Sequence, residues 1–473
     1  MYYLNCDKNL ELSRITKSPF YLILLSCFLA LISSVYFASA AFAAGLPVFP
    51  GAEGFGTDTR AAYGGGSDPY VYKVTNLNAS GSGSLRNCIE DNLNKGPRVC
   101  VFEVSGTIKV TSDIVATDPY LTIAGQTAPS PGITVRGAAI HIATHDVLLQ
   151  HVRIRVGDEP GGPSGDNRDG LKIANSSGNV HHVVADHVSV SWGTDENIQI
   201  WNPTNDLTVS NSITSETLDC SIHNEGCHSK NFIIGYKSNR TSVINNLMAH
   251  SRERQPLIQS STEVINNVMY NYTVQATRLA PRDATAYVSI IGNVYLEGPD
   301  SGSTLPVTYN GVAAPDLVYV RDNSENGVVP QNPWDLVANE PANTKANSPP
   351  IQSTSVSIMD NSDVLAYVLA NAGARPVDRD AVDKRIIDDV RNRKGRIIDS
   401  QNEVGAWPNL SETRRTLNLP ANMHGDNDGD GYTNLEEWLH VFSAEVEGKG
   451  NPLPVPPPVS NAPDPPANLR IIY

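Results

Sequence analysis

The chain has 473 residues, with 35 Lys and Arg against 50 Asp and Glu, so its formal net charge is −15 at pH 7. Hydrophobic residues make up 40% of the chain, enough for a sizeable core, and this composition excludes a largely disordered protein. The acidic balance argues against nucleic-acid binding, because phosphates would be repelled. If the ligand is itself an anion, local cations must bind it.

Residues 1–43 are predicted to be a signal peptide. Basic residues precede an apolar run over 20–37, and two Ala-x-Ala cleavage patterns follow, ending at Ala40 and Ala43. The alternative is a retained anchor, because the apolar run approaches the ~20 residues that span a bilayer. No other stretch of the sequence is apolar and long enough to span. We therefore expect a secreted or periplasmic protein that does not contact the membrane after this segment is removed.

Four cysteines follow that segment, namely Cys88, Cys100, Cys220 and Cys227. An even number in an exported protein favours two disulfides. Pairing Cys88 with Cys100 and Cys220 with Cys227 costs the least chain entropy, because these pairs close the shortest loops. The alternative is four free thiols. A zinc site is disfavoured, because no CxxC pair with histidine spacing is present.

Residues 69–297 repeat a pattern of short Val- and Ile-rich runs separated by Asn, Ser, Gly and Asp, which predicts many strands and few helices. A polar residue interrupts each run at spacings of roughly 20 to 36 residues, as in a solenoid. These residues are His151, His187, Asn211, Asn246, Asn267 and Asn293. Stacked from coil to coil, they would form a ladder that satisfies backbone groups. We predict an all-β parallel β-helix over 44–300, closed at one end by a helix that follows Ser84.

Residues 301–360 are rich in Pro, Asn and Ser without a clear period and are predicted to be loop. A helical extension is predicted over 361–445, where apolar residues at helical spacing form a hairpin whose two helices stop near Gly373 and Gly395. We expect this hairpin to pack on the solenoid. The Pro-rich residues 446–473 are predicted to be a disordered tail.

Within the extension, residues 426–437 fit the EF-hand-like pattern D-x-D-x-D-G-x5-E at every position. In this pattern calcium is bound by the side chains of Asp426, Asp428 and Asp430, the backbone carbonyl of Tyr432 and the carboxylate of Glu437. A single such loop indicates a structural calcium clip rather than a sensor. The alternative is an acidic turn without a metal.

Four other motifs carry a resemblance to a known family. They are Phe49-Pro-Gly-Ala-Glu-Gly-Phe-Gly, Val74-Thr-Asn-Leu-Asn-Ala-Ser-Gly-Ser-Gly-Ser-Leu-Arg, Leu121-Thr-Ile-Ala-Gly-Gln-Thr-Ala-Pro and Asp186-His-Val-Ser-Val-Ser-Trp-Gly-Thr-Asp-Glu-Asn. Together they resemble the bacterial pectate lyases of polysaccharide lyase family 1, over about residues 49–297. The resemblance implies a right-handed parallel β-helix, calcium at the cleft, and cleavage of polygalacturonate by β-elimination.

The chemistry of β-elimination explains which residues to seek. The reaction removes a weakly acidic carbon proton next to a uronic acid carboxylate, so it needs cations that neutralise the carboxylate and stabilise the enolate-like transition state. Calcium ions and guanidinium groups suit both tasks. Calcium binds several oxygens at about 2.3–2.6 Å, so we expect carboxylates from adjacent coils to face one cleft.

By their match to the family's motifs, Asp169 and Asp195 are predicted calcium ligands, and Gln199 stands where the family often has a third carboxylate. On an extended strand Asp195 and Gln199 point the same way, and Glu196 points to the opposite face. An amide oxygen brings no charge, so we expect weaker calcium binding or an ion that bridges to an anionic substrate. The alternative is that Asp169 and Asp195 are turn residues that satisfy backbone groups.

Arg254, in an Arg-x-Pro setting, aligns with the family's catalytic arginine, and the resemblance implies that it is the base. Arginine has a pKa above ~12, but calcium and alkaline conditions narrow the gap to a weakly acidic carbon proton. Lys230 is similar to the family's lysine that binds a substrate carboxylate. The family often has a further basic residue shortly after the arginine, and here that support is missing unless Arg252 replaces it. The alternatives are a surface ion pair for Arg254 and a solvated Lys230.

We therefore predict an exported, calcium-dependent pectate lyase that cleaves pectate, or polygalacturonate, to unsaturated oligogalacturonides. We expect a monomer that binds this polysaccharide and no nucleic acid. A second hypothesis is a weakly active or inactive β-helix that binds acidic polysaccharide, favoured by the missing third carboxylate and the missing second cation. A third hypothesis is a lyase for another polyuronate.

Overall fold

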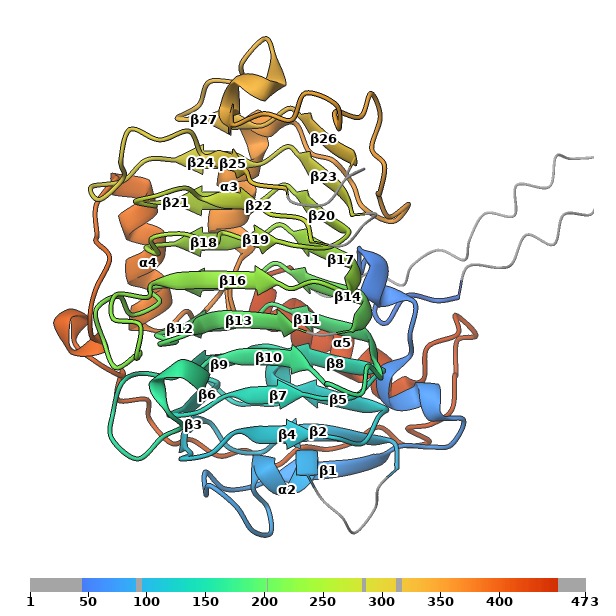
Figure 1. The fold of residues 1–473 in the computed structure, drawn as a ribbon. Coiled ribbons are helices and arrows are strands. Elements are labelled where there is room, and N and C mark those ends of the chain that lie inside the picture. Colours follow the sequence, from blue (N-terminus) through green and yellow to red (C-terminus); the bar gives the residue numbers. More distant parts are fainter. Residues whose placement is uncertain (1–44, 91–95, 202, 283–285, 312–316, 450–473) are drawn as a thin grey trace, which may run out of the picture. The chain divides into compact units, whose positions relative to one another are not determined.

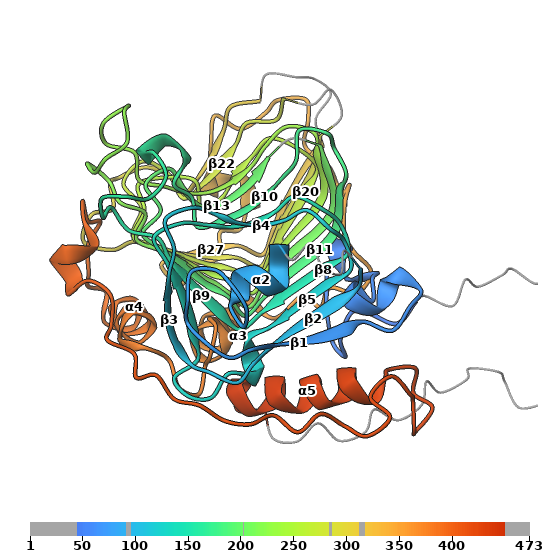
Figure 2. The same ribbon diagram turned by 90° about the horizontal axis from the view of Figure 1, so that it is seen from below.

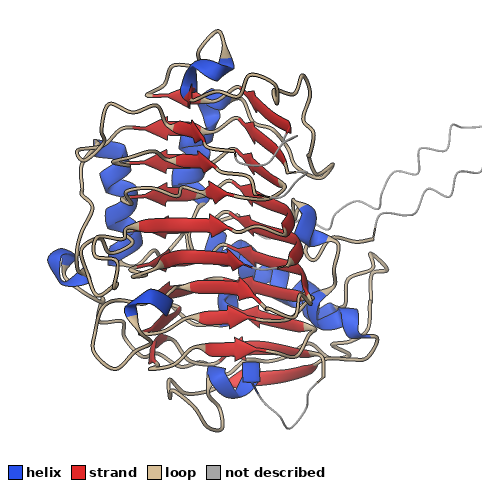
Figure 3. Ribbon diagram, in the orientation of Figure 1, coloured by secondary structure: helices blue, strands red, loops and turns tan. Residues whose placement is uncertain are grey.

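The Val- and Ile-rich runs form a right-handed parallel β-helix, in which successive coils contribute strands to three parallel sheets (Figure 1). This computed structural model describes residues 45–90, 96–201, 203–282, 286–311 and 317–449. Strands far outnumber helices (Figure 3). The predicted fold class is confirmed.

We number the three sheets in the order in which a coil passes through them. The first sheet contains β1 (Tyr70–Val74), β2 (Arg98–Phe102), β5 (Leu121–Ala124), β8 (Val147–Gln150), β11 (Val180–Asp186), β14 (Thr204–Ser210), β17 (Ser238–Ile244), β20 (Thr262–Ile265), β23 (Tyr287–Ile291) and β26 (Leu317–Arg321). The second contains β3 (Gly106–Lys109), β6 (Ile133–Arg136), β9 (Val152–Arg155), β12 (Ser189–Ser191), β15 (Ile213–Ser215), β18 (Leu247–Ala249), β21 (Val268–Tyr270), β24 (Val294–Leu296) and β27 (Ser324–Glu325). The third contains β4 (Ile114–Ala116), β7 (Ile140–Ile142), β10 (Leu171–Ala174), β13 (Glu196–Trp201), β16 (Lys230–Ile234), β19 (Leu257–Ile258), β22 (Thr277–Leu279), β25 (Val307–Tyr309) and β28 (Val337–Ala338).

Aliphatic side chains fill the interior of the solenoid and stack from coil to coil. Val183 on β11 is in register with Val147 on β8 and Leu207 on β14, and all three side chains are fully buried. Burying one such side chain contributes about 1.5–3 kcal/mol, and parallel pairing satisfies the backbone groups that are buried with it. The repeated apolar positions therefore both align and stabilise the coils.

An asparagine ladder runs inside the turn between the first and second sheets. Asn246 donates to Asn267, Asn267 to Asn293, and Asn293 to Asn323, at 3.0, 3.0 and 2.9 Å. All four side chains are buried. The predicted ladder is confirmed for Asn246, Asn267 and Asn293, and Asn323 extends it by one coil.

His151, His187 and Asn211, predicted for the same ladder, occupy the preceding position of that turn. Their backbones are left-handed, with φ of 58°, 49° and 47°, like those of Asn245 and Asn266 directly before the ladder asparagines. Asn and His are among the residues that tolerate this conformation best. The alignment of the repeats is therefore wrong by one residue at these three coils, because polarity alone does not distinguish the two neighbouring turn positions.

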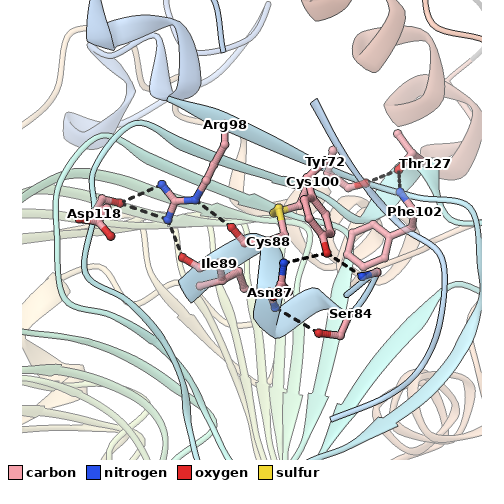
Figure 4. The surroundings of a disulfide bond; sticks show 12 residues. Tyr72, Ser84, Asn87, Cys88, Ile89, Arg98, Cys100, Phe102, Asp118 and Thr127 are labelled. Carbon is pink, nitrogen blue, oxygen red and sulfur yellow. Dashed lines mark hydrogen bonds between the residues drawn. A yellow bond between two sulfur atoms is a disulfide. The ribbon is translucent and has the colours of Figure 1, made fainter. Parts of the chain in front are cut away.

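Helix α2 (Leu85–Glu90) closes one end of the solenoid, as predicted, and the Ser84 hydroxyl accepts a hydrogen bond from the amide of Asn87 at its start. A disulfide joins Cys88 of this helix to Cys100 on β2 (Figure 4). Beside it, the Arg98 guanidinium donates to the carbonyl of Cys88 at 2.8 Å. Covalent and polar contacts thus hold the cap on the first coils. The second predicted disulfide, between the cysteines at 220 and 227, is confirmed as well.

Three longer helices of the C-terminal extension pack on the outside of the solenoid (Figure 2). They are α3 (Asn361–Asn371), α4 (Ala381–Asn392) and α5 (Asn434–Glu447). The short 3-10 turns are η1 (Phe55–Thr57), η2 (Ala61–Gly65), η3 (Gly125–Thr127), η4 (Gly165–Asn167), η5 (Pro333–Leu336) and η6 (Gln401–Val404). The predicted hairpin, α3 and α4, shares a hydrophobic cluster with the second sheet, whereas α5 packs against the first sheet.

A buried ion-pair network also joins the hairpin to the second sheet. Arg155 on β9 lies 2.9 Å from Asp380, the N-cap of α4, and 2.8 Å from Asp383. All three side chains are fully buried. Removing one partner of such a pair typically costs about 3–5 kcal/mol, because the other charge stays buried. The extension is therefore an integral part of the folded unit from Leu46 onward.

The solenoid continues beyond residue 300, where the prediction ended it. Val294 pairs with Ser324, and Val307 pairs with Val337, so β25 to β28 form further turns of the solenoid. The described part of 301–360 thus contains β25 to β28 and is not loop throughout. Long polar connections hide the period of these short strands in the sequence. The predicted signal peptide and residues 450–473 of the predicted tail lie outside the described residues. Within the described ranges, no helix has both the length and the hydrophobicity to cross a membrane.

Candidate active site

Three carboxylates converge where β10 and β13 of the third sheet begin. Asp169 precedes β10, Asp195 precedes β13, and Glu196 is the first residue of β13. One carboxylate oxygen from each lies within 4.8 Å of the others. Asp169 and Glu196 are buried, whereas the Asp195 side chain is 17% exposed. We call these three residues the carboxylate cluster.

Glu196 belongs to the cluster although strand alternation predicted that it points away from Asp195. The alternation is interrupted at the start of β13, because Asn197 and Ile198 are consecutive and both fully buried. Asn197 donates to the carbonyl of Ser215 at 2.9 Å. The prediction for Glu196 is therefore wrong, and a third carboxylate lies beside Asp169 and Asp195 although position 199 is a glutamine.

Gln199 lies further along β13, where it is the register partner of Lys172 on β10. The Lys172 ammonium group lies 3.3 Å from Asp169 Oδ2 and 3.1 Å from Asp113 Oδ2. A lysine thus compensates part of the negative charge on the Asp169 side. The role of Gln199 as a calcium ligand stays a prediction.

The carboxylate cluster concentrates negative charge in a poorly hydrated place. Burial and then the charge of Asp195 raise the pKa of Asp169 to about 7. Burial and Asp195 also raise the pKa of Glu196 well above its ordinary value, although Arg254 opposes the shift. Burial alone would raise the pKa of Asp195 too, but a hydrogen bond with His228 brings it below the ordinary value. A bound cation would relieve this repulsion.

The cluster fits calcium by its donor set and by its excess of negative charge. All three side chains offer carboxylate oxygens, the ligands that calcium prefers. Asp169 Oδ1 accepts the amide of Glu196 at 3.1 Å, and its buried Oδ2 forms an ion pair with Lys172 at 3.3 Å. The three carboxylates outnumber Lys172 and Arg254, which pair with two of them, so a bound cation would offset the remaining negative charge. Asp169, Asp195 and Glu196 would therefore hold the ion.

Arg254 and Lys230, the two predicted cations, both lie next to Glu196. The Arg254 guanidinium forms an ion pair with the Glu196 carboxylate, and its side chain remains 17% exposed. Lys230 on β16 is the register partner of Glu196 and lies 3.5 Å from Glu225. Both predicted cations are therefore next to the cluster and reachable from solvent. Their positions beside a carboxylate site suit the binding of an anionic ligand.

The chain is similar to curated fungal proteins along most of its length. It is 35% identical over 414 residues to the probable pectate lyase C of Neosartorya fischeri, which covers 85% of this chain and 88% of that protein. It is 33% identical over 453 residues to the probable pectate lyase C of Aspergillus flavus, covering 88% and 97%. The chain belongs to the pectate lyase family. The relatives found are fungal, so the expectation of a specifically bacterial type is not supported.

Solved structures share the fold at lower identity. A pectate lyase bound to a hexasaccharide is 14% identical with a TM-score of 0.50, and the match covers 71% of this chain and 99% of that one. The major allergen from cedar pollen is 16% identical with a TM-score of 0.50, covering 67% and 91%. No family model matches the chain. These solved structures therefore show that the chain shares their fold.

Two further arginines, Arg252 and Arg278, lie near the positive side of the candidate site. Arg252, the predicted second cation, is 38% exposed and lies 3.5 Å from Asp219. Arg278 on β22 lies one coil beyond Arg254, and the two line the same small hollow with Leu257. The sequence search missed Arg278, because only the stacking of coils brings it beside Arg254.

Two histidines that the sequence analysis missed support Asp195. His228 Nε2 lies 3.1 Å from Asp195 Oδ1, and the ring of His223 stacks on His228 with 3.6 Å between centroids. Both come from the loop near the disulfide between Cys220 and Cys227. Two histidines beside a short disulfide loop are the only signal in the sequence, and it does not indicate their target.

The EF-hand-like loop lies outside the cleft, at the start of α5. Asp426 accepts the amides of Gly429 and Gly431 at 2.7 and 3.0 Å, so the loop is folded around its first carboxylate. Asp428 Oδ1 accepts the amide of Asp430 at 3.2 Å. Asp426, Asp428 and Asp430 are exposed, in contrast to Asp169 and Glu196 of the carboxylate cluster.

The remaining predicted ligands of this loop are placed consistently with the pattern. Asp430 Oδ1 accepts the amide of Tyr432, whose hydroxyl donates to the carbonyl of Pro47 at 2.8 Å. Glu437 lies in the first turn of α5, where burial and then Asp428 and Asp430 raise its pKa. The loop carboxylates therefore face one another, and the set of oxygen donors fits calcium.

Proposed function

We propose that this protein is an exported, calcium-dependent pectate lyase that cleaves polygalacturonate by β-elimination and releases unsaturated oligogalacturonides. The observation that carries the proposal is the contact between Arg254 and Glu196, which joins a candidate base to a candidate calcium site. Membership of the pectate lyase family supports it independently.

A bound calcium ion would neutralise the substrate carboxylate and so acidify the carbon proton beside it. Asp169, Asp195 and Glu196 would hold the ion, while Lys230 binds a second carboxylate of the polymer. Arg278 extends the positive surface by one coil. These local cations would thus bind an anionic polymer although the formal net charge of the chain is −15.

In the proposed reaction, the Arg254 guanidinium first releases a proton to solvent at alkaline pH, and the neutral guanidine accepts the proton from the carbon next to the uronic acid carboxylate. The electron pair of that C–H bond forms the new C=C bond, the C–O bond to the leaving sugar breaks, and water protonates the departing sugar oxygen. The ion pair with Glu196 fixes the guanidinium beside the metal ligands, so that base and electrophile act on the same sugar ring. The left-handed backbone of Arg254, with φ of 64°, turns this residue out of the strand direction.

The rival hypotheses are a polysaccharide-binding β-helix with little activity and a lyase for another polyuronate. The first rested on a missing third carboxylate and a missing second cation, and Glu196 and Arg278 weaken both arguments. The second is not distinguished by the charges of the site, because all polyuronates carry carboxylates.

An assay of three polymers separates these hypotheses. The unsaturated product absorbs ultraviolet light, so absorbance is followed with polygalacturonate, methylated pectin and alginate, each with calcium and with a chelator. We expect a calcium-dependent rise with polygalacturonate. Binding without a rise for any polymer would indicate the binding hypothesis, and a rise with alginate alone would indicate the other lyase.

For the EF-hand-like loop we propose a structural role. Its ligands Asp426, Asp428, Asp430, Tyr432 and Glu437 would bind calcium and fix the start of α5. The loop shares no residue with the carboxylate cluster. Its ion would therefore contribute to folding stability and not to the transition state.

A further inference from the structure

A second cluster of metal-ligand side chains lies at the turn between the first and second sheets, away from the third sheet. It consists of His151, Asp186, His187 and Glu447, and one ligand-type atom of each lies within 4.8 Å of the others. His151 follows β8, His187 follows β11, and Glu447 ends α5. The two imidazole rings are buried and stack with 5.2 Å between centroids. We call this set the histidine cluster.

The partners of the two imidazole rings indicate which nitrogen carries the proton in each. His151 Nδ1 lies 2.9 Å from the carbonyl of Ala374, which can only accept, so this nitrogen is the donor. His187 Nδ1 lies 2.7 Å from Asp186 Oδ2 and donates in the same way. A neutral ring of this form keeps a lone pair on Nε2. Histidines that ligate metals are usually oriented by such a carbonyl or carboxylate.

Neither of these Nε2 atoms has a hydrogen-bond partner in the described part of the chain. His151 Nε2 lies 3.4 Å from Glu447 Oε1, so a lone pair and a carboxylate oxygen face each other in a buried place. The other oxygen of Glu447 is 2.7 Å from the ammonium of Lys449, which leaves Oε1 available. Two such acceptors repel unless a cation lies between them.

The distances suit a small transition-metal ion better than calcium. Ligands bound tetrahedrally at about 2.0–2.1 Å lie roughly 3.3–3.4 Å apart, which matches the separation of His151 Nε2 and Glu447 Oε1. One ring nitrogen of His187 lies within 4.8 Å of a ligand atom of each of these two residues. Two imidazoles and one carboxylate form a donor set that zinc favours, whereas calcium favours oxygen. Asp186, His187 and Glu447 also line a cavity of about 620 Å³, through which an ion could enter.

We propose that His151, His187 and Glu447 bind a zinc-like divalent ion, with Asp186 orienting His187. The ion fixes the C-terminal end of α5 to two coils of the solenoid. The EF-hand-like loop lies at the opposite end of the same helix. Each end of α5 would thus be held by a metal of a different chemical class.

A competing explanation is a proton shared between the imidazoles and Glu447, without a metal. Burial opposes protonation of His187, but Asp186 and Glu447 raise its pKa above the ordinary value. The pKa of Glu447 falls to about 2, because His187 and His151 outweigh its burial. Both explanations need a cation at the same place, so the experiment must distinguish zinc from a proton.

The test measures zinc binding by the full-length protein in excess calcium, which keeps the calcium sites out of the comparison. The protein is stripped with a chelator that prefers zinc, zinc chloride is added, unbound metal is removed, and bound zinc is measured by mass spectrometry. We expect one more zinc per chain in the wild type than in His151→Gln or Glu447→Gln. Loss of a ligand should weaken binding by at least the ~10–100-fold that loss of an orienting partner costs.

His181→Gln is the matched control, since His181 stacks on His145 with 4.5 Å between centroids in a half-exposed cluster on the same sheet. It should retain the wild-type amount of zinc. Zinc should raise the melting temperature of the wild type and of this control by several degrees, but not that of Glu447→Gln. Cobalt bound in place of zinc should give the wild type the visible absorption bands that are typical of a tetrahedral site.

Three outcomes would overturn the proposal. They are a wild type that retains no zinc, equal zinc contents in wild type and Glu447→Gln, and a melting temperature that Glu447→Gln lowers equally with and without zinc. The last outcome is what a shared proton predicts. Because Glu447 ends an outer helix, its variant carries the test even if His151→Gln fails to fold.

Discussion

The carboxylate cluster and the EF-hand-like loop both present carboxylates for calcium, but they are built in opposite ways. The cluster draws Asp169 from one coil and Asp195 and Glu196 from the next, and two of these side chains are buried. The loop takes all its candidate ligands from residues 426–437, and three of them, Asp426, Asp428 and Asp430, are exposed. Buried ligands beside Arg254 would act on substrate charge, whereas ligands at the start of a helix would act on the order of the chain. The comparison therefore leads us to propose catalysis for the cluster and stability for the loop.

The largest expected loss of rate follows substitution of Arg254, the proposed catalytic base. Arg254→Lys keeps a positive charge but loses the planar guanidinium that contacts Glu196. We expect initial rates on polygalacturonate to fall on the order of 10²-fold or more, with the melting temperature unchanged. The control is Arg321→Lys, an exposed arginine of the first sheet, which should keep the wild-type rate. Near wild-type turnover by purified Arg254→Lys would contradict the assignment of the base.

The second prediction asks which residue is the third carboxylate of the cleft. Glu196→Gln keeps the shape of the side chain and removes its charge, so the calcium concentration for half-maximal rate should rise on the order of 10-fold. Gln199→Glu should lower that concentration only slightly, because Lys172 already compensates charge nearby. Calcium titrations of the initial rate measure both. If Gln199→Glu has the larger effect, the ion lies further along β13 than proposed.

The third prediction uses the protonation of the cluster without calcium. The pKa of Asp169 is raised from 3.8 to about 7, first by burial and then by Asp195. Between these values the folded state binds more protons than the unfolded state, so the stability of the calcium-free protein falls as pH rises from about 4 to about 7. Asp169→Asn removes the contribution of Asp169 to this dependence, whereas Glu196, whose pKa is also raised, keeps its own.

In chelator at pH 8, Asp169→Asn should therefore melt a few degrees above the wild type, and the difference should shrink toward pH 4. Excess calcium should reverse the order, because only the wild type regains the ion. Melting curves at several pH values check both statements. A wild type whose melting temperature in chelator does not fall over this range would show that Asp169 is ionised without a metal.

The contrast between the two sites also explains how far the sequence could predict them. Every candidate ligand of the loop could be named, because the calcium-binding pattern depends on spacing within one segment. The solenoid and both disulfides were predictable for a similar reason, since repeated Val and Ile runs and short cysteine spacings are local signals. Asp169, Asp195 and Arg254 are predicted site residues only because their motifs resemble the family.

The errors arose where the structure departs from a regular period. Glu196 was placed on the wrong face because two consecutive buried residues, Asn197 and Ile198, interrupt the strand alternation. Arg278 was missed because its partner Arg254 lies on another coil. His151 was aligned one position out, because a left-handed turn residue and a ladder residue are both polar. Register and turn conformation depend on the packing of many coils, which no single segment encodes.

The smallest expected change in rate follows substitution of Glu437. This variant tests whether the EF-hand-like loop contributes to stability and not to catalysis. Glu437→Gln removes the charge of a candidate calcium ligand that lies near Asp428 and Asp430. The loop's ion binds the native state only, so its binding free energy is lost from stability and not from transition-state stabilisation. In calcium we expect the melting temperature to fall by several degrees. The rate per folded molecule at about 25 °C should stay within about twofold of the wild-type rate.

The control for that variant is Glu445→Gln, an exposed glutamate on the same helix and outside the loop, which should change neither quantity. Thermal melts with calcium and with chelator isolate the contribution of the ion, because Glu437→Gln and the wild type should melt much closer together in chelator than in calcium. Initial rates at saturating calcium then decide the assignment of function. A rate loss for Glu437→Gln as large as that for Glu196→Gln would mean that the loop shapes the substrate site, since loss of a remote stabilising ion leaves the geometry around Arg254 unchanged.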